Sequence, residues 1–477
     1  MIDQGGHATR AIIFDEIGNI VCRAESAIKT ITRGELEVEH DPAELLASVN
    51  LVIDQVYESL GADYSKIKKA GLATQRSSIA CWNKKNGQAL SPIISWQDRR
   101  CFKQIAQYEN YAEFIHHSSG LYLNPHYGAT KMRWCLDNLA EVKKCLDENA
   151  LCVAPLASYI LFHLLDEKPF AIDPANASRT LLMNYKSLNW EEELLTLFSV
   201  PKNVLPDIVF TRNTFGHIER HGHKIPLQIC TGDQSAVIYS EGKLADDEVF
   251  VNAGTGAFII KTCDEIPDLK KQKILTSIVY ADQEHIEYVL EGTVNGAGRA
   301  LLWFADQSGI QDYESHLDFW CASVSNPPVF INAISGIGSP FWIAESESYF
   351  SRESSEEDPE KPGNEEKFVA VLESIIFLAA ENIKCIERVS SKISQIRIAG
   401  GLASSYEFCQ KLANLLNCRV IRAHEQEATA KGVFYLLSAQ TSHKSALCSA
   451  MFNPKNDQML INRHRYWLEQ MTNKFPV

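Results

Sequence analysis

The sequence predicts a two-domain α/β protein, and three observations support this prediction. At 477 residues the chain is longer than one ordinary hydrophobic core accommodates. Hydrophobic residues make up 45% of it and charged residues 22%, which is typical of a globular protein. Each half opens with a β-hairpin around a glycine-containing turn and continues with strand–helix units, the internal duplication expected of a two-lobed α/β fold.

The expected elements of the first half follow from periodicity and turn signals. Strands are expected at 9–14 and 17–23, on either side of the Asp15-Glu16 hairpin turn. Apolar residues at helical spacing predict a helix from Pro42 to Leu60. The remaining expectations are strands at 70–74 and 79–83, a largely helical region at 129–165, and a helix whose N-cap is Asn189.

The second half repeats this pattern. A strand, turn and second strand are expected at 248–261, and a long apolar helix at 368–389. The other expectations are a strand end leading into a helix at 289–306, strands at 393–398 and 418–422, and helices at 404–416 and 429–439. These patterns place the domain boundary after residue 241, giving domains of 1–241 and 242–477. The acidic stretch 345–367 is expected to be a surface insertion.

Composition excludes several classes of function. The net charge of −14 argues against binding a nucleic-acid backbone. No apolar run approaches the ~20 residues that span a bilayer, and the start lacks the features of a signal peptide. The 13 cysteines form an odd, unpatterned set without a Cys-x-x-Cys pair, which indicates reduced thiols. We therefore expect a cytoplasmic protein without nucleic-acid or membrane partners.

Two short motifs suggest phosphoryl transfer. Gly232-Asp233-Gln234 follows an apolar strand, where a lone carboxylate can act as a base. Gly254-Thr255-Gly256 can offer backbone N–H groups and a hydroxyl to phosphate oxygens. A base and a phosphate cradle are what phosphoryl transfer to an alcohol requires. Each motif alone also has an ordinary interpretation, because such sequences are common in surface turns and hairpins.

Taken together, the motifs resemble those of the FGGY carbohydrate kinases, in particular their glycerol-kinase-like branch. The resemblance covers nearly the whole chain, in the family's order. It is carried by residues 3–5, 10–15, 38–42, 74–76, 95–99, 129–131, 176–180, 232–234, 254–256, 291–292, 336–340 and 399–401. It implies two ribonuclease-H-like domains of the actin and hexokinase type with a catalytic cleft between them. ATP would bind mainly to the second domain and a sugar or polyol mainly to the first. A homodimer is a further expectation.

On the acceptor side, the resemblance makes Asp233 the general base. The same residue and Gln234 would contact the acceptor's hydroxyls. Arg76, Trp96 and Phe258 match residues that hold a polyol, and Ser77 and His126 occupy two further substrate positions. Other interpretations remain open, since Asp233 could cap a helix, Gln234 could be a surface residue and Trp96 could belong to the core.

On the nucleotide side, the resemblance assigns Asp3 and Asp233 to Mg²⁺, with water completing its shell. The residues expected to contact ATP lie in turns of both halves. They are Gly5, Gly6, Thr9, Arg10, Gly254, Thr255, Gly256, Gly298, Gly400, Gly401 and Ser404. A strand–Gly-Gly–helix pattern such as that at Gly400-Gly401 can also serve packing alone.

The chain departs from the family's pattern in three places. The first phosphate hairpin normally carries hydroxyl side chains, but here reads Gly6-His7-Ala8, with only Thr9 hydroxylated. The first strand is expected to be short. Glycerol kinases carry Glu and Tyr where this chain has Ser77 and His126, so a longer acceptor of four to seven carbons is an alternative to glycerol. The altered hairpin also leaves open a weakened sugar- or nucleotide-binding regulator.

Overall fold

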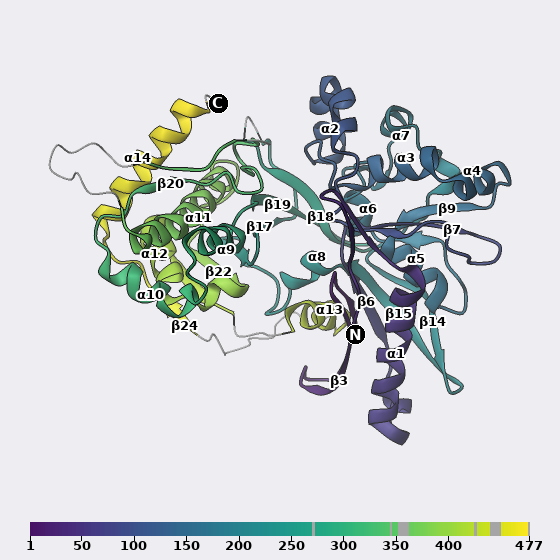
Figure 1. Cartoon of the computed structure of the whole chain (residues 1–477). Coiled ribbons are helices and arrows are strands. Elements are labelled where there is room, and N and C mark those ends of the chain that lie inside the picture. Colours follow the sequence, from purple (N-terminus) through teal and green to yellow (C-terminus); the bar gives the residue numbers. More distant parts are fainter. Residues whose placement is uncertain (270–271, 344–345, 352–361, 424–426, 439–449, 476–477) are drawn as a thin grey trace. The chain divides into compact units, whose positions relative to one another are not determined.

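The computed structural model describes residues 1–269, 272–343, 346–351, 362–423, 427–438 and 450–475 (Figure 1). About half of the expected insertion at 345–367, namely residue 345 and residues 352–361, lies outside these residues. The chain forms two compact units. Unit 1 comprises Met1–Lys243, Thr276–Tyr288 and Glu425–Lys444, and unit 2 comprises Leu244–Leu275, Val289–His424 and Ser445–Val477. Among the described residues, we find no helix with the length and apolarity needed to cross a membrane.

A six-stranded sheet organises unit 1. Its strand order is β14 (Arg212–Arg220), β15 (His223–Gly232), β6 (Ala70–Thr74), β1 (Ile2–Gln4), β2 (Ala8–Phe14) and β3 (Ile20–Ala27). β6 is parallel to β1 and β15, and the other pairs are antiparallel. The carboxyl ends of β1, β6 and β15 therefore meet at one edge, where the side chains of interest gather.

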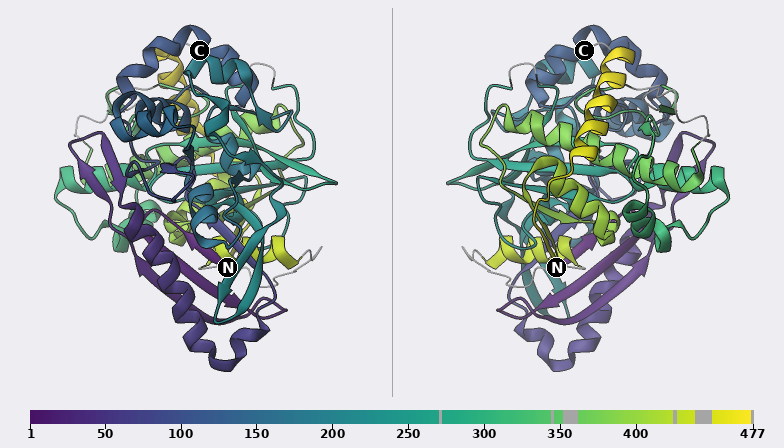
Figure 2. Two further views of the ribbon diagram at one scale, coloured as in Figure 1. Left: turned by 90° about the vertical axis from the view of Figure 1, so that its right-hand side faces the viewer. Right: turned by 90° about the vertical axis from the view of Figure 1, so that its left-hand side faces the viewer.

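Helices cover both faces of this sheet. Successive side chains of a strand point to opposite faces. The hydroxyl of Thr9 in β2 meets Ser48 of α1 (Pro42–Leu60), whereas a side chain at Gly71 would fall 2.4 Å from Val433 of α13 (Ala428–Ser438). Thr9 pairs with Gln4, which points to the same face as Ile2 and its partner Leu72. Gly71 lies one residue before Leu72, so it points to the other face. The helices α1 and α13 therefore lie on opposite faces of the sheet. Figure 2 shows α1, in dark purple, along the purple strands β2 and β3.

The helix α1 has the bounds that its apolar spacing predicts, Pro42 to Leu60. The Asp41 side chain caps it by accepting hydrogen bonds from the N–H groups of Ala43 and Glu44. Pro42 fits the first turn, where no intrahelical donor is needed, and Gly61 ends the helix with φ of 54°. Capping and amphipathic spacing thus agree, which is why this boundary could be predicted.

A second, five-stranded sheet of unit 1 carries the loops on the acceptor side. Its strands, in order, are β4 (Ile31–Arg33), β5 (Glu37–His40), β8 (Ile93–Ile94), β7 (Ile79–Asn83) and β9 (Leu151–Pro155). The associated helices are α2 (Ala112–Ser119), α3 (Gly128–Asn138), α4 (Ala140–Asp147) and α5 (Leu156–Leu164). The region 129–165 is therefore helical as expected, except for β9, whose five residues are all buried and so lack alternation.

The prediction of a helix N-cap at Asn189 is wrong. Asn189 and Trp190 form strand β12 and pair with β11 (Met183–Asn184). The helix α7 begins later, at Glu192, and ends at Phe198. The Trp190 indole donates to the Pro206 carbonyl at 2.7 Å, so burial of this large side chain holds the segment extended.

A seven-stranded sheet supplies most strands of unit 2. Its order is β18 (Leu275–Ala281), β19 (Ile286–Val294), β17 (Ala257–Cys263), β16 (Glu248–Ala253), β22 (Gln395–Ala399), β23 (Arg419–Arg422) and β24 (Ala450–Phe452). Most of β18 and the first residues of β19 fall within the unit 1 range Thr276–Tyr288. β16 pairs antiparallel with β17 and parallel with β22. The order β15-β6-β1-β2 in unit 1 therefore matches β23-β22-β16-β17, which confirms the predicted duplication.

The hydrophobic core of unit 2 surrounds α11 (Asn364–Glu387), which is buried along most of its length. The expected helix at 368–389 corresponds to it. Other helices of this unit are α9 (Gly298–Ser308), α10 (Tyr313–Ser323), α12 (Tyr406–Leu416) and α14 (Gln458–Lys474). A short two-stranded sheet, β20 (Val329–Ile331) with β21 (Tyr349–Ser351), completes the unit.

Candidate active site

Two carboxylates lie at the carboxyl edge of the unit 1 sheet. Asp3 lies in β1, and Asp233 follows β15 as the first residue of the short helix α8 (Asp233–Val237). Each has a guanidinium nearby: Arg10 Nη1 lies 4.0 Å from Asp3 Oδ2, and Arg76 Nε lies 4.0 Å from Asp233 Oδ1. The Gln234 N–H donates to Asp233 Oδ1 at 2.6 Å, which orients this carboxylate.

The electrostatics of this edge disfavour two negative charges. Burial, followed by repulsion from Asp233, raises the pKa of the Asp3 carboxyl to about 7, against the attraction of Arg10. Burial also raises the pKa of Asp233 above its usual range, while Arg76 and the Gln234 N–H act in the opposite direction. A carboxylate with a raised pKa is a better proton acceptor, and a cation between the two would relieve their repulsion.

The predicted acceptor residues of unit 1 lie in neighbouring loops. Arg76 follows β6 and its aliphatic part lies against Gly232, where a Cβ atom would fall 2.5 Å from Arg76 Cγ and Cδ. Trp96 packs edge-on against His126 with ring centroids 5.3 Å apart. All three side chains are half-buried, so each keeps a face open to a small molecule.

His126 carries no charge at neutral pH. Burial, with added repulsion from Lys131 and Arg179, lowers the pKa of the imidazole to about 3. A neutral imidazole has one donor and one acceptor nitrogen, which suits a hydroxyl group better than a carboxylate. Ser77, beside Arg76, is buried and has a positive φ of 63°, a conformation rarely adopted by serine.

The first glycine turn lies next to the acceptor loops. The Gly5 N–H donates to the Ala8 carbonyl at 2.9 Å, which closes the turn. A Cβ atom at Gly6 would lie 3.4 Å from Trp96 Nε1, so this turn borders the tryptophan. The Thr9 side chain does not lie with the glycine turn and the acceptor loops, because its buried hydroxyl shares a 2.7 Å hydrogen bond with Ser48 on the other face of the sheet.

In unit 2, the glycine motifs come together at the carboxyl ends of β16 and β22. Gly400 has φ of 93°, and a Cβ atom there would lie 2.5 Å from the Ala253 carbonyl. Gly298 also approaches Gly254 closely, with a 2.9 Å hydrogen bond from its N–H to the Gly254 carbonyl. The Thr255 side chain is exposed at the tip of the β16–β17 turn. Glycine is required at Gly400 by both its conformation and its contact.

The remaining predicted residues of unit 2 lie around these turns. Gly401 has no heavy atom within 4 Å of an added Cβ, so its surroundings are open. The Ser404 hydroxyl donates to the Gly401 carbonyl at 2.7 Å. Phe258, the predicted acceptor residue of this unit, is half-buried in β17 opposite Asn252.

Two family models match the chain. The N-terminal domain of the FGGY family of carbohydrate kinases matches residues 1–238, and its C-terminal domain matches residues 249–440. The chain belongs to the FGGY family of carbohydrate kinases.

Curated relatives and solved structures agree with this assignment. The chain is 30% identical over 453 residues to a glycerol kinase from Borreliella burgdorferi, covering 93% of this chain and 89% of the relative. It is 28% identical to a glycerol kinase from Natranaerobius thermophilus, covering 91% and 88%. A Plasmodium falciparum glycerol kinase solved with ADP has a TM-score of 0.89 at 23% identity, covering 100% and 97%. A xylulose kinase from Lactobacillus acidophilus has a TM-score of 0.83 at 20% identity, covering 99% and 97%.

This carbohydrate kinase is therefore an enzyme that transfers a phosphoryl group from ATP to a hydroxyl group of a small polyol or sugar. The two-domain α/β fold expected from the sequence is confirmed by its structural neighbours.

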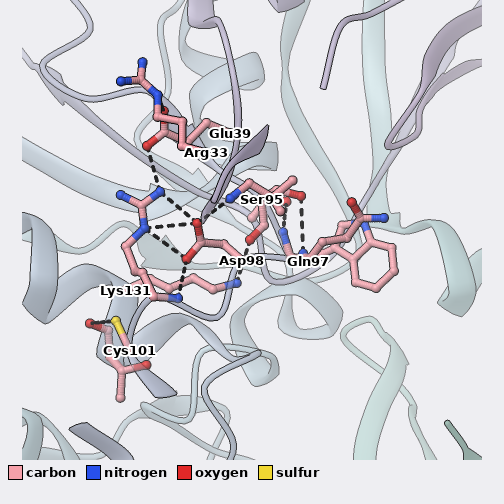
Figure 3. Close-up of polar contacts among 12 residues, drawn as sticks. Arg33, Glu39, Ser95, Gln97, Asp98, Cys101 and Lys131 are labelled. Atoms are coloured by element: carbon pink, nitrogen blue, oxygen red, sulfur yellow. Dashed lines mark hydrogen bonds and ion pairs between the residues drawn. The ribbon is translucent and has the colours of Figure 1, made fainter. Parts of the chain in front are cut away.

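Sequence reasoning missed two buried charged residues of this kinase and a third that is half-buried. Lys131, at the start of α3, is fully buried and bonded to three loop carbonyls. Asp98 is fully buried and accepts from Arg100 and from the Val38 N–H (Figure 3). Glu427 adds a third negative charge near Asp3 and pairs with Arg23 at 3.2 Å. Lys131 and Asp98 lie inside motifs of the resemblance, which was the only available signal.

The structure was also searched for clusters of at least three metal-ligating side chains. None occurs among the residues that it describes. Two carboxylates, however, suffice for a Mg²⁺ ion that keeps most of its water and is shared with substrate phosphates. The mutual repulsion of Asp3 and Asp233 fits such a cation.

Proposed function

We propose that this kinase phosphorylates glycerol or a closely related small polyol, with Asp233 as the general base. The acceptor is supported by the curated relatives, which are glycerol kinases at about 30% identity over most of both chains. The role of Asp233 is supported by one observation above all: a partly buried carboxylate with a raised pKa lies beside the arginine of the acceptor loops.

In the proposed reaction, Asp233 accepts the proton of the acceptor hydroxyl as its oxygen bonds to the γ-phosphorus. The bond between that phosphorus and the β–γ bridging oxygen breaks, and ADP leaves with its electron pair. The Gln234 N–H and the Arg76 guanidinium hold the carboxylate in one orientation beforehand. Such positioning lowers the entropic cost of reaching the transition state.

Acceptor binding is assigned to the half-buried loop residues. Arg76 offers a fixed fork of donors to adjacent hydroxyls, and neutral His126 offers one donor and one acceptor. Trp96 provides a flat apolar face for the carbon chain, and Phe258 a second aromatic surface. Ser77, Asp233 and Gln234 complete the predicted set.

Nucleotide binding is assigned to the glycine turns. The proposed contacts from unit 1 are Gly5, Gly6, Thr9 and Arg10, with Thr9 contributing through its backbone since its hydroxyl is bonded to Ser48. Those from unit 2 are Gly254, Thr255, Gly256, Gly298, Gly400, Gly401 and Ser404. Asp3 and Asp233 would hold Mg²⁺ through water, and the ion would neutralise developing charge on the phosphates.

We also propose domain limits of 1–241 for acceptor binding and 242–477 for ATP binding, a cytoplasmic location and a homodimeric state. Twelve cysteines among the described residues are free thiols, which favours a reducing compartment. Size-exclusion chromatography with light scattering tests the homodimer, for which a mass near that of one chain would be the contrary result.

A panel of acceptors, read by ADP release, tests the proposed substrate. Glycerol should be turned over with the highest kcat/KM. Ser77 is short where the glycerol-kinase branch carries glutamate, so the second candidate is a ketose or polyol of four to seven carbons. Turnover of such acceptors without glycerol would select it. Tight binding of ADP without turnover of any acceptor would select the weakened regulator, which the Gly6-His7-Ala8 turn motivates.

The variant Asp233→Asn tests the base directly. We expect it to lose phosphoryl transfer by a factor of about 10²–10⁴, because amide nitrogen and oxygen cannot accept the hydroxyl proton at neutral pH. ADP affinity, measured by calorimetry, should stay close to that of the wild type. Turnover near the wild-type rate would refute the assignment.

A further inference from the structure

One buried amine joins the three loops that carry the unit 1 acceptor residues. Lys131 lies in the first turn of α3 and has no exposed surface. Its Nζ donates to the Ser77 carbonyl at 3.1 Å, the Ser95 carbonyl at 2.8 Å and the His126 carbonyl at 2.8 Å. An ammonium group has three N–H donors, and these three carbonyls use all of them.

Each of these carbonyls adjoins a residue assigned to the acceptor. The Ser77 carbonyl belongs to the residue after Arg76, the Ser95 carbonyl forms the peptide bond with Trp96, and the third belongs to His126 itself. From this arrangement we infer that Lys131 is a positioning residue, which sets the spacing of Arg76, Trp96 and His126 around the acceptor. The inference rests on the proposed function of those three side chains.

The segments that Lys131 holds would not keep this arrangement unaided. Ser77 has a positive φ of 63°, which costs a non-glycine residue free energy and requires contacts that impose it. The neighbouring Ser78 hydroxyl accepts from the Trp96 N–H at 2.9 Å. The loop of Ser77 and the loop of Trp96 are therefore joined both by this bond and by Lys131. The His126 loop has a bond from its own N–H to Asn124, which is local and does not reach the other two loops. Lys131 therefore adds a hydrogen bond that ties the His126 backbone to them, beside the ring contact of His126 with Trp96.

The charge of Lys131 is compensated by an alternating chain of ionised groups rather than by direct pairing. Arg100 donates to Asp98 and to Glu39, each at 2.7 Å. Glu39 in turn lies 3.5 Å from Arg33. The Asp98 N–H shares the Ser95 carbonyl with Lys131 (Figure 3). Burial lowers the pKa of the Lys131 amine to about 7, against the attraction of Asp98. Its three carbonyl acceptors favour the ammonium form, because a neutral amine has only two N–H donors.

A lysine that served packing alone would have a different signature. Its loss would lower stability and total activity together, without distinguishing acceptor from nucleotide. A positioning residue instead changes the geometry of the acceptor loops while the glycine turns of unit 2 stay intact. Its loss should raise the KM for the acceptor and leave the KM for ATP unchanged.

The test compares Lys131→Met and Lys131→Gln with the wild type. Methionine keeps most of the volume and removes all three donors, whereas glutamine keeps two donors and removes the charge. With glycerol as acceptor, or D-xylulose if the wild type uses only that, we expect the KM for the acceptor to rise about tenfold or more in Lys131→Met. Lys131→Gln should give a smaller rise. In both variants the KM for ATP and the acceptor-independent ATPase rate should stay within about twofold of the wild type.

The matched control is Lys411→Met. Lys411 is also a buried lysine, bonded to Glu373 at 3.0 Å, and Glu373 keeps its two bonds from Arg463 when Lys411 is lost. The thermal stability of the Lys411→Met variant should fall, while its KM for the acceptor stays unchanged.

An unchanged acceptor KM in Lys131→Met, or an equal rise in both KM values, would overturn the inference. So would failure of both Lys131 variants to fold, because the lysine would then belong to the general fold. If the wild type phosphorylates no acceptor of the panel, the proposed function fails. If the wild type is active and the Lys131 variants keep its acceptor KM, only the inference about Lys131 fails.

Discussion

The variant Gly232→Ala tests whether the position of Arg76 controls acceptor use. Gly232 has φ of −82° and ψ of 150°, an extended conformation open to any residue, so alanine adds no backbone strain. The added methyl group would instead fall 2.5 Å from Arg76 Cγ and Cδ. Carbon atoms in contact lie about 3.5–4.0 Å apart, so the arginine must move by about 1 Å or more.

The size of the effect follows from that displacement. Arg76 Nε lies 4.0 Å from Asp233 Oδ1, and a shift of about 1 Å changes both this contact and the donors offered to the acceptor. Misplacement of a positioning group by about 1 Å can lower the rate by about 10²-fold. We therefore expect kcat/KM for the acceptor to fall about 10- to 100-fold, equivalent to about 1.4–2.7 kcal/mol of transition-state stabilisation.

The assay measures kcat/KM for the acceptor and for ATP separately, together with the melting temperature. Gly363→Ala serves as control, because the nearest heavy atom to its added Cβ is 3.9 Å away. In the double variant Gly232→Ala/Arg76→Ala, the loss should not exceed that of Arg76→Ala alone. A Gly232→Ala enzyme whose acceptor kcat/KM stays within about twofold of the wild type would refute the reasoning.

Two further predictions concern the two carboxylates and the second glycine turn. The pKa of Asp3 is about 7 in the folded protein against an ordinary 3.8, so its ionisation costs folding stability above pH 7 and nothing below pH 4. Asp3→Asn should therefore raise the free energy of unfolding at pH 8, without Mg²⁺, by up to about 4 kcal/mol, whereas a gain of the same size at pH 4 would contradict this explanation. In Gly400→Ala, the alanine must adopt φ near 93° and displace the Ala253 carbonyl. We therefore expect the melting temperature to fall by several degrees and ADP to bind about tenfold more weakly in calorimetry. A wild-type melting temperature together with wild-type ADP affinity would exclude Gly400 from the nucleotide site.

The regular elements could be predicted because local signals agree there. The helix α1 has apolar spacing, a capping aspartate, a proline in its first turn and a terminal glycine, and its observed bounds are the predicted ones. β9 and β12 were missed for the opposite reason. The residues of β9 are all buried and carry no alternation, and Asn189 is typical of a cap although Trp190 is held extended by burial.

The candidate site could be predicted only in part. The motifs indicated Asp3, Asp233 and the glycine turns, and the topology brings the first two to one sheet edge. The sequence does not show which way a side chain faces across a sheet, so the hydroxyl of Thr9 was counted with the phosphate turn although it meets Ser48 on the other face. Nor does it show what Lys131 contacts, although this residue lies inside a motif of the resemblance, because two of its three carbonyl partners are distant along the chain.

The packing of α13 on Gly71 bears on how the protein is made. Unit 1 begins at Met1, yet one face of its central strand β6 is covered by a helix that begins at Ala428. Ribosomes add about 5–20 residues per second and α13 begins about 350 residues after β6, so that face stays uncovered for about 20 to 70 s after β6 has been synthesised. The apolar face of β6 can therefore pack against α13 only after most of the chain has been synthesised.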